Sequence, residues 1–305
     1  MDLSASGITV IIPTTCELRR WESLQRAIAS VMQQSGVTPR VLAVVNGQRF
    51  DPTRYEALCQ MPGVEVVYLA EGNASLAQRT GRSLVTTAYF AFLDDDDEYL
   101  PGGLKARLVP LEQDNALDFV ASQGVRCFDG VDQPCWPSTG AIHRDPLRAL
   151  ADTNWLASCG GLFRTRSIAV DYFDGCSRYL EWTLLAYKLA ASRRMVFVDT
   201  ATFRIHDSPG SLSKSTAYRY GEIDVILKIL QLQLPGDVRE SVRVKLGKAH
   251  HDVSDFCRRQ KLNTDAWRHH ASSLRQPGGW RFFPYTRKLL AMGLPWPKQS
   301  GSSHG

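Results

Sequence analysis

The chain has 305 residues, of which 44% are hydrophobic and 22% are charged, and it contains 23 Gly and 15 Pro. This length suits one large domain or two moderate ones with a buried core, and the composition excludes disordered and collagen-like proteins. No run approaches the ~18 apolar residues that a membrane span needs, and the start lacks the pattern of a secretory signal. Seven scattered cysteines without a C-x-x-C pair predict neither a disulfide framework nor a zinc site.

The charge is unevenly distributed along the chain. Residues 216–305 hold 15 Lys+Arg and 7 Asp+Glu, a net charge of +8, whereas residues 1–215 hold 21 and 24, a net charge of −3. The basic C-terminal region therefore either meets an anionic partner or presents a solvated helical face.

The first third of the chain alternates short apolar strands with helices. Strands are predicted at Ile8–Ile12, Arg40–Val45, Val64–Leu69 and Tyr89–Leu93, and helices are predicted after Trp21, at Tyr55–Met61 and at Ala74–Thr87. This alternation predicts right-handed crossovers and a mostly parallel sheet, whose ligands bind at the carboxyl ends of the strands.

The pattern changes towards the C-terminus. Strand-like runs at Asp118–Phe128 and Met195–His206 enclose a predicted helix at Arg178–Ala191. Beyond Ser215 the apolar spacing is helical only, with a break at Leu234–Asp237. We therefore expect an α/β domain over residues 1–215 and a basic helical region over residues 216–305.

Four consecutive aspartates, Asp94 to Asp97, directly follow the fourth predicted strand. Their mutual repulsion raises pKa values and costs stability unless a cation neutralises them. Hard divalent cations prefer carboxylate oxygens, and Mg²⁺ is commonly held by one or two carboxylates plus substrate phosphates. The alternative is a solvated acidic loop that precedes the next helix.

Five segments carry a resemblance to a known family. They are VIIPTTCE at Val10–Glu17, LAQRTG at Leu76–Gly81, FLDDDDEYLP at Phe92–Pro101, YLEWTLLAYKLA at Tyr179–Ala190 and FRIHDSPGSLS at Phe203–Ser213. In order and spacing they resemble the motifs of family 2 glycosyltransferases. The resemblance implies a GT-A fold, a Rossmann-like and mostly parallel sheet flanked by helices, here with a C-terminal helical extension. It also implies a nucleotide-sugar donor (UDP-, GDP- or dTDP-sugar) and a divalent metal, Mn²⁺ or Mg²⁺.

The same resemblance assigns residues to the donor. Those expected to border the nucleotide or its phosphates are Pro13, Thr14, Thr15, Glu17, Asn46, Arg79, Asp94 and Asp95. Asn46 stands where many members carry an aspartate that reads the base, and an Asn-Gly turn is its alternative interpretation. Arg79 would face the diphosphate, or it is a surface arginine on its helix.

The metal ligands implied by the resemblance are Asp96, from the D-x-D pattern Asp94–Asp96, and His206. Asp97 would orient its neighbours. A lone histidine is more often structural, so the assignment of His206 as a ligand depends on the family match at its "RIH" segment.

Inverting glycosyl transfer needs a base that deprotonates the acceptor hydroxyl. Aligning Trp182 with the family's Glu-Asp-Trp-Asp motif places Glu181 at the position of the catalytic aspartate. The extra methylene departs from the family pattern. The alternative is a glutamate favoured by the dipole at a helix N-terminus.

The acceptor is expected to be a carbohydrate or lipid-linked surface glycan, near the segment Asn154–Gly161. Trp136, Trp155 and Trp182 either stack on sugars or fill the core. The run Trp280–Leu290 interleaves aromatic and basic residues, which suits a peripheral contact at the inner face of the membrane of a cytoplasmic enzyme, or a helix packed on the first domain. No nucleic-acid motif accompanies the charge.

The sequence therefore predicts an inverting, metal-dependent glycosyltransferase. Two rival hypotheses are a non-catalytic nucleotide- or sugar-binding module, motivated by the atypical Asn46 and Glu181, and a nucleotidyltransferase. The second lacks the Gly- and Lys-rich loop that would cradle a triphosphate after the first strand.

Overall fold

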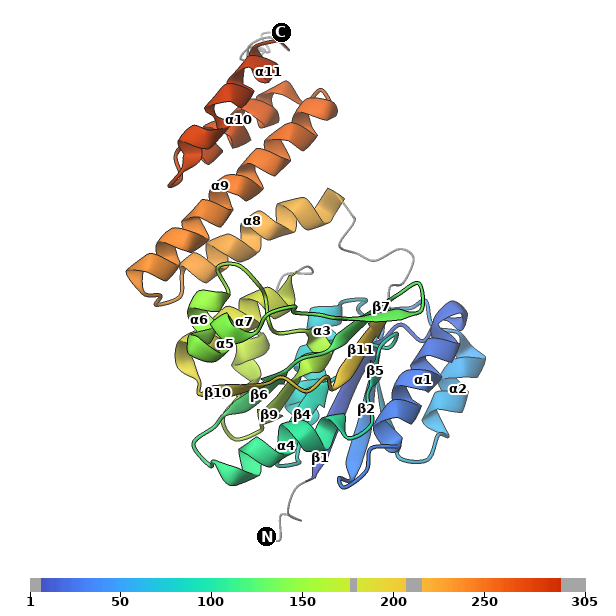
Figure 1. The fold of residues 1–305 in the computed structure, drawn as a ribbon. Coiled ribbons are helices and arrows are strands. Elements are labelled where there is room, and N and C mark those ends of the chain that lie inside the picture. The colour runs from blue at the N-terminus through green and yellow to red at the C-terminus, as the bar shows by residue number, and fades with distance from the viewer. Residues whose placement is uncertain (1–6, 176–179, 207–215, 292–305) are drawn as a thin grey trace. The chain divides into compact units, whose positions relative to one another are not determined.

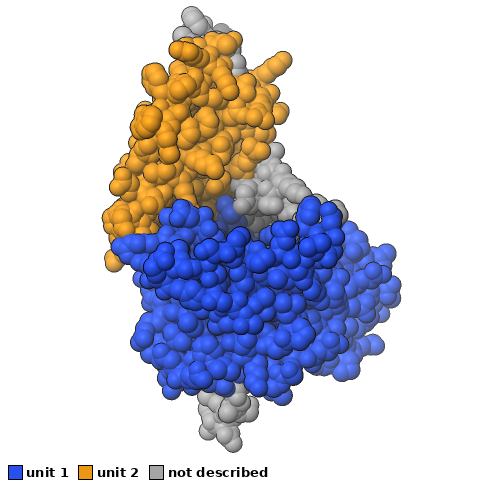
Figure 2. Space-filling model, viewed as in Figure 1, with its two compact units in different colours: residues 1–212 blue, residues 213–305 orange. Residues whose placement is uncertain are grey.

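The computed structural model describes residues 7–175, 180–206 and 216–291. The chain divides into two compact units, residues 1–212 and residues 213–305, which Figure 2 colours separately. The boundary predicted after residue 215 falls outside the described residues.

A seven-stranded sheet of order β10-β6-β9-β4-β1-β2-β3 forms the centre of the first unit (Figure 1). All neighbouring strands are parallel except β9, which runs antiparallel to β4 and β6. The strands are β1 (Ile8–Thr14), β2 (Pro39–Asn46), β3 (Val64–Leu69), β4 (Tyr89–Phe92), β6 (Phe119–Ser122), β9 (Gly161–Arg164) and β10 (Met195–Val198). The expected mostly parallel α/β architecture is confirmed.

Helices cover this sheet because their apolar stripes have no other surface to bury. The helical segments of the first unit are η1 (Leu18–Arg20), α1 (Trp21–Met32), α2 (Pro52–Cys59), α3 (Ala74–Leu84), α4 (Gly103–Gln113), α5 (Gly140–Arg144), α6 (Pro146–Ala149), η2 (Ser158–Gly160), η3 (Val170–Phe173) and α7 (Glu181–Ser192). In α1 the buried residues include Leu24, Ile28 and Val31, the spacing expected for one helical face. β1 and β2 are buried along nearly their whole length, as parallel strands covered on both faces should be.

A second, four-stranded sheet has the order β5-β11-β7-β8. Its strands are β5 (Glu98–Tyr99), β7 (Val125–Phe128), β8 (Val131–Pro134) and β11 (Phe203–His206). β11 pairs antiparallel with β5, so Arg204 lies opposite Glu98. This pairing brings the segment that ends at His206 next to the segment that follows the aspartates.

The second unit is helical, as expected. It contains α8 (Thr216–Leu230), α9 (Gly236–Arg259), α10 (Asn263–Leu274), η5 (Gly279–Tyr285) and α11 (Thr286–Leu290), and α9 packs against both α8 and α10. The apolar residues of α9 that are spaced as on one helical face, Val238, Val242, Leu246, Ala249 and Val253, are buried, whereas Phe256, which continues the spacing, is partly exposed. On α8, Ile223 and Ile226 are buried, whereas Leu227 is 46% exposed.

Within the described ranges, no helix is both long enough and apolar enough to cross a bilayer.

Candidate active site

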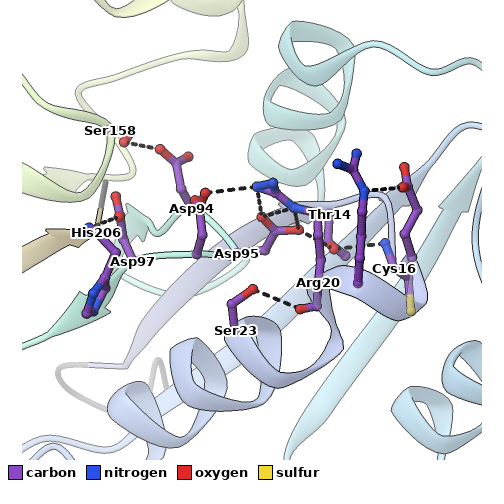
Figure 3. Close-up of polar contacts among 12 residues, drawn as sticks. Thr14, Cys16, Arg20, Ser23, Asp94, Asp95, Asp97, Ser158 and His206 are labelled. Atoms are coloured by element: carbon purple, nitrogen blue, oxygen red, sulfur yellow. Dashed lines mark hydrogen bonds and ion pairs between the residues drawn. The ribbon is translucent and has the colours of Figure 1, made fainter. Parts of the chain in front are cut away.

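The carboxyl ends of β1 and β4 meet at one edge of the large sheet. The pairing of these two strands ends at Ile11 and Phe92, and β1 continues beside β2 as far as Thr14. Thr14 Oγ1 then donates a 2.6 Å hydrogen bond to Asp95 Oδ2 (Figure 3). The sequence places an apolar strand directly before each of these polar residues, and the parallel topology brings them together.

The loop after β1 is held in a fixed conformation. Cys16 has a positive φ of 49°, which a non-glycine residue adopts only where its surroundings impose it. Its N–H donates to Thr14 Oγ1 at 3.0 Å, and Asn46 Nδ2 donates to the Thr14 carbonyl at 3.0 Å. Hydrogen bonds thus join the end of β1 at Thr14, the loop residue Cys16 and the end of β2 at Asn46 beside the aspartates, with Pro13 and Thr15 on either side of Thr14.

Glu17 closes this loop on its outer side. Its carboxylate pairs with Arg19 at 2.7 Å and with Arg49 at 3.3 Å. Burial opposes ionisation of the Glu17 carboxyl, but Arg19, Arg49 and Thr15 outweigh it and lower its pKa. Glu17 is thus an ionised residue in a network that joins the loop after β1 to Arg49, downstream of β2.

The four aspartates differ in their surroundings. Asp94 accepts a 2.5 Å hydrogen bond from Ser158, and Asp97 accepts one of 3.0 Å from the His206 N–H. Burial, aided by repulsion from the neighbouring aspartates, raises the pKa of Asp94 to about 6 and that of Asp97 well above its ordinary value. The Asp96 side chain is the more open one, at 23% exposure against 6% for Asp95. The run is therefore a packed site and not a solvated loop.

Arg20 is a site residue that the sequence analysis missed. Its Nε donates to Asp95 Oδ1 at 3.0 Å, and its Nη2 donates to Asp96 Oδ2 at 3.0 Å. Figure 3 shows the guanidinium reaching the aspartates from the start of α1. An arginine in front of an amphipathic helix carries no motif, so only the fold reveals this ion pair.

A buried arginine forms hydrogen bonds to the segment that carries Ser158. Arg107, on α4, is fully buried and donates from Nη1 to the carbonyls of Cys159 at 2.7 Å and Gly161 at 3.2 Å. Charged donors aimed at carbonyls make strong hydrogen bonds, so Arg107 fixes the position from which Ser158 meets Asp94.

Glu181 is the first residue of α7 and is only partly exposed. Leu180, just before it, has a positive φ of 60°, a conformation that directs the chain into the helix at a cost in backbone strain. Burial, reinforced by the charge of Asp94, raises the pKa of Glu181 to about 7, and a hydrogen bond from Gln78 opposes this shift. The structure thus brings Glu181 within electrostatic reach of the aspartates.

His206 lies beside the aspartates but its ring faces another carboxylate. His206 Nε2 is 3.1 Å from Glu98 Oε1, which also accepts a 2.7 Å hydrogen bond from Arg204 Nη1. Burial opposes ionisation of Glu98, yet Arg204 and His206 lower its pKa. The motif residues that follow His206, 207–213, lie outside the described residues.

The donor set suits a divalent ion that a diphosphate would complete. Throughout the described ranges, no three or more His, Cys, Asp or Glu side chains are grouped so that they could hold a metal ion. Asp96 is a partly exposed carboxylate among buried ones, and Mg²⁺ commonly takes one or two carboxylates, with substrate phosphates and waters as further ligands. Asp96 could therefore supply one carboxylate to a divalent ion whose other ligands are phosphates and water.

Arg79 and the three tryptophans named from the sequence make contacts of other kinds. Arg79, on α3, forms an ion pair with Asp174, and both side chains are about half exposed. Trp155 is fully buried and Trp136 is 8% exposed, so both belong to the core. Trp182 is partly exposed and packs edge-on against Phe92, with ring centroids 5.3 Å apart.

A mostly parallel sheet flanked by helices is the architecture expected of the GT-A fold. The family model described as "Glycosyl transferase family 2" matches residues 9–173, more than half of the chain, and the chain belongs to this family. This membership favours a glycosyltransferase over both rival hypotheses. A search of curated proteins finds no significant match.

Solved structures share the fold at low identity. S. aureus TarS 1-349 superposes with a TM-score of 0.55 at 13% identity, covering 81% of this chain and 72% of that one. The complex of TarS 1-349 with UDP-GlcNAc gives a TM-score of 0.57 at 16% identity, covering 81% and 73%. A longer TarS structure gives 0.62 at 13% identity, covering 94% of this chain and 53% of that one.

Proposed function

We propose that the enzyme transfers a sugar from a nucleoside diphosphate to an acceptor hydroxyl with inversion, and that Glu181 is the general base. The observation that carries this proposal is the position of Glu181, a partly exposed carboxylate at the first residue of α7, close enough to Asp94 for the two charges to interact. In this position burial raises the pKa of Glu181 to about 7. A base with a pKa near the working pH combines a useful deprotonated fraction with sufficient basicity. If Glu181 served only as a favourable negative charge at the helix N-terminus, its burial beside Asp94 would merely disfavour that ionised form.

The nucleotide-sugar is proposed to lie over the loop after β1 and the ends of β2 and β4. The residues assigned to it are Pro13, Thr14, Thr15, Glu17, Asn46, Arg79, Asp94 and Asp95. UDP is the first nucleotide to test, ahead of GDP and dTDP, because TarS structures of the same fold hold UDP and UDP-GlcNAc.

Asp96 is the proposed carboxylate ligand of a divalent metal, Mn²⁺ or Mg²⁺, and His206 is proposed to assist from β11. A bound ion would stabilise the negative charge that develops on the departing diphosphate. Asp95 is proposed to face the ribose, while Asp97, which accepts the His206 N–H, holds β11 against the aspartate loop. Because the His206 ring contacts Glu98, its approach to a metal requires a rotation of that side chain.

Glu181 is proposed to accept the proton of the acceptor hydroxyl as that oxygen attacks the anomeric carbon. Gln78, whose hydrogen bond reaches Glu181, orients the carboxylate, and Leu180 fixes the start of α7. The proton moves to Glu181 while the bond to the diphosphate breaks, and the attack on the opposite face inverts the anomeric configuration.

The acceptor is proposed to be a carbohydrate or lipid-linked surface glycan, reached at the inner face of the membrane. Support comes from the second unit, where Trp280 is 77% exposed and Phe283 67% exposed. From residue 266 onward the chain has 6 Lys+Arg and no Asp or Glu. Exposed aromatic rings among basic residues suit the interface of an anionic bilayer.

The test is a transfer assay with UDP-sugars and a panel of sugar and lipid-linked acceptors, with Mn²⁺ or Mg²⁺ and with a chelator. We expect turnover that the chelator abolishes and an inverted anomeric product. A retained configuration would contradict the proposed mechanism, and undiminished turnover in chelator would contradict the metal.

A further inference from the structure

Arg20 occupies the carboxylates that the proposed function gives to the donor. Its guanidinium donates from Nε to both Asp95 oxygens, at 3.0 and 3.2 Å, and from Nη2 to Asp96 Oδ2 at 3.0 Å. Nη2 also lies 2.9 Å from Asp95 Oδ1. One side chain thus bridges the two aspartates assigned to the ribose and the metal.

These contacts conflict with a bound metal. Asp95 Oδ2 already accepts hydrogen bonds from Thr14 and Arg20, and Asp95 Oδ1 accepts one from Arg20. Asp96 Oδ2 faces Arg20 Nη2 at hydrogen-bond distance. A divalent ion on Asp96 would lie beside a guanidinium of the same sign, and the two cations would repel each other. Arg20 has to withdraw when the ion binds.

The local structure permits this withdrawal without refolding. The backbone of Arg20 is fixed, because Ser23 Oγ donates to its carbonyl at 2.9 Å and the next residue, Trp21, is 8% exposed. The Arg20 side chain is 30% exposed, so its guanidinium can rotate towards solvent while α1 stays in place. A phosphate oxygen would offer it a new charged acceptor.

We propose that Arg20 is a competing cation that neutralises Asp95 and Asp96 until the metal and the nucleoside diphosphate arrive together. This inference rests on the proposed function. A metal that binds alone must break the ion pairs of Arg20 with Asp95 and Asp96, and the guanidinium then has no new anionic partner. A diphosphate that binds with the metal supplies such a partner. Metal and nucleotide therefore bind with positive coupling, and by linkage each raises the affinity of the other by the same factor.

Mn²⁺ binding to the full chain tests this inference directly, measured by the electron paramagnetic resonance of free Mn²⁺ with and without UDP. In the wild type we expect weak Mn²⁺ binding alone and binding about tenfold or more tighter with UDP. In Arg20→Gln we expect Mn²⁺ alone to bind about tenfold more tightly, so that the effect of UDP shrinks.

Arg26→Gln is the matched control. Arg26 lies on α1, which begins directly after Arg20, and also contacts Asp96, but it donates to the backbone oxygen, at 3.0 Å, and not to the carboxylate. Removing its charge should leave Mn²⁺ affinity within about twofold of the wild type, because Arg26 is exposed to solvent and occupies neither carboxylate. An equal gain in both variants would overturn the inference in favour of a general charge effect.

Thermal melting supplies a second measurement on the same variants. In a chelator, Arg20→Gln should melt below the wild type, and Mn²⁺ should raise its melting temperature by more. Should Arg20→Gln fail to fold, Arg20→Lys replaces it, since a single ammonium cannot bridge both carboxylates in the same way and should give a smaller shift in the same direction.

The outcomes separate this inference from the proposed function. If UDP enables Mn²⁺ binding in the wild type but Arg20→Gln gains no affinity for Mn²⁺ alone, Arg20 is not the competitor and the metal assignment stands. If the wild type binds no Mn²⁺ with UDP, GDP or dTDP, both the metal assignment and the role of Arg20 are wrong.

Discussion

Thr14 and Asp95, 81 positions apart in the sequence, are joined by a buried hydrogen bond of 2.6 Å. The bond joins the end of β1 to the loop after β4. It also positions Asp95, which accepts a further hydrogen bond from Arg20. The proposed donor site is therefore held by contacts between two strand ends.

Replacing Thr14 with valine should weaken donor binding and stability together. The Asp95 oxygen loses its buried donor, which typically costs about 1–3 kcal/mol. We expect a lower melting temperature and a higher KM for the donor. Thr9→Val is the control, because Thr9 lies on the same strand, is also buried, and makes a 2.8 Å hydroxyl bond to Thr87 near the start of the strand. Equal donor KM values in the two variants would contradict a donor role for Thr14.

Asp96→Asn should impair the metal-dependent step. Metal stabilisation of a leaving phosphate contributes several kcal/mol, so we expect at least about a hundredfold lower kcat and a higher Mn²⁺ requirement. Asp199→Asn removes an exposed carboxylate that pairs with His143, and it should leave both values near those of the wild type. Full activity of Asp96→Asn at low Mn²⁺ would show that Asp96 is not a metal ligand.

The sequence predicts the parallel strands of the sheet and the approximate positions of their ends. The strands expected to end at Ile12, Val45 and Leu93 end at Thr14, Asn46 and Phe92 in the structure, and parallel pairing places these ends along one edge. The bounds differ where local chemistry intervenes. The helix predicted to reach Thr87 ends at Leu84, and the β-branched residues Val85 to Thr87 follow it in extended or irregular backbone.

Contacts that depend on tertiary structure could not be predicted. β9, at Gly161–Arg164, begins where the acceptor loop was expected to end, and its four residues are too few to show a period. Arg20 and Arg107 carry no local pattern, since each gains its role from a partner about 50 or more positions away. The positive φ of Leu180 is likewise imposed by the fold.

Acid should destabilise the helical unit. Burial, reinforced by His269 and Arg268, lowers the pKa of His250 to about 4, and its Nδ1 lies 2.9 Å from His269 Nδ1. A base with a depressed pKa contributes stability that is full above its unfolded value of about 6.5 and is lost as the pH falls towards 4. We expect up to about 2 kcal/mol of loss between pH 7 and pH 5.

Hydrogen exchange in α9 and α10 at these two pH values measures this loss locally. His250→Gln should flatten the pH dependence, since glutamine does not titrate. An exchange rate in these helices that is equally pH-dependent in the variant and the wild type, after correction for intrinsic exchange, would assign the effect to other groups.

Exposed aromatic residues of the second unit should bind anionic vesicles. Trp280→Ala with Phe283→Ala removes two side chains that are 77% and 67% exposed, so the fold should tolerate the change. We expect the wild type to sediment with phosphatidylglycerol vesicles but not with phosphatidylcholine vesicles, and the double variant to stay in solution. Leu227→Ala, on α8 and also exposed, is the control. No sedimentation of the wild type with either vesicle would refute membrane contact through this surface.

Glu181→Gln should stabilise the free enzyme at alkaline pH. Because burial raises the pKa of Glu181 from 4.5 to about 7, ionisation costs the folded state free energy as the pH rises through this range. The shift corresponds to at most about 3 kcal/mol above pH 7. The variant should therefore melt at a higher temperature than the wild type at pH 8 in a chelator, and at a similar temperature at pH 4.5. Equal melting temperatures at pH 8 would show that Glu181 ionises without cost.

The pH dependence of kcat/KM for wild type and Glu181→Gln tests the central claim most directly. The account predicts that the wild-type value rises about tenfold per pH unit below pH 7 and levels off above it, since the base must be deprotonated. Glu181→Gln should lose about 10²–10⁴-fold and lack this rise. A folded Glu181→Gln variant that keeps both the wild-type rate and its acidic limb would contradict the assignment of Glu181 as the base.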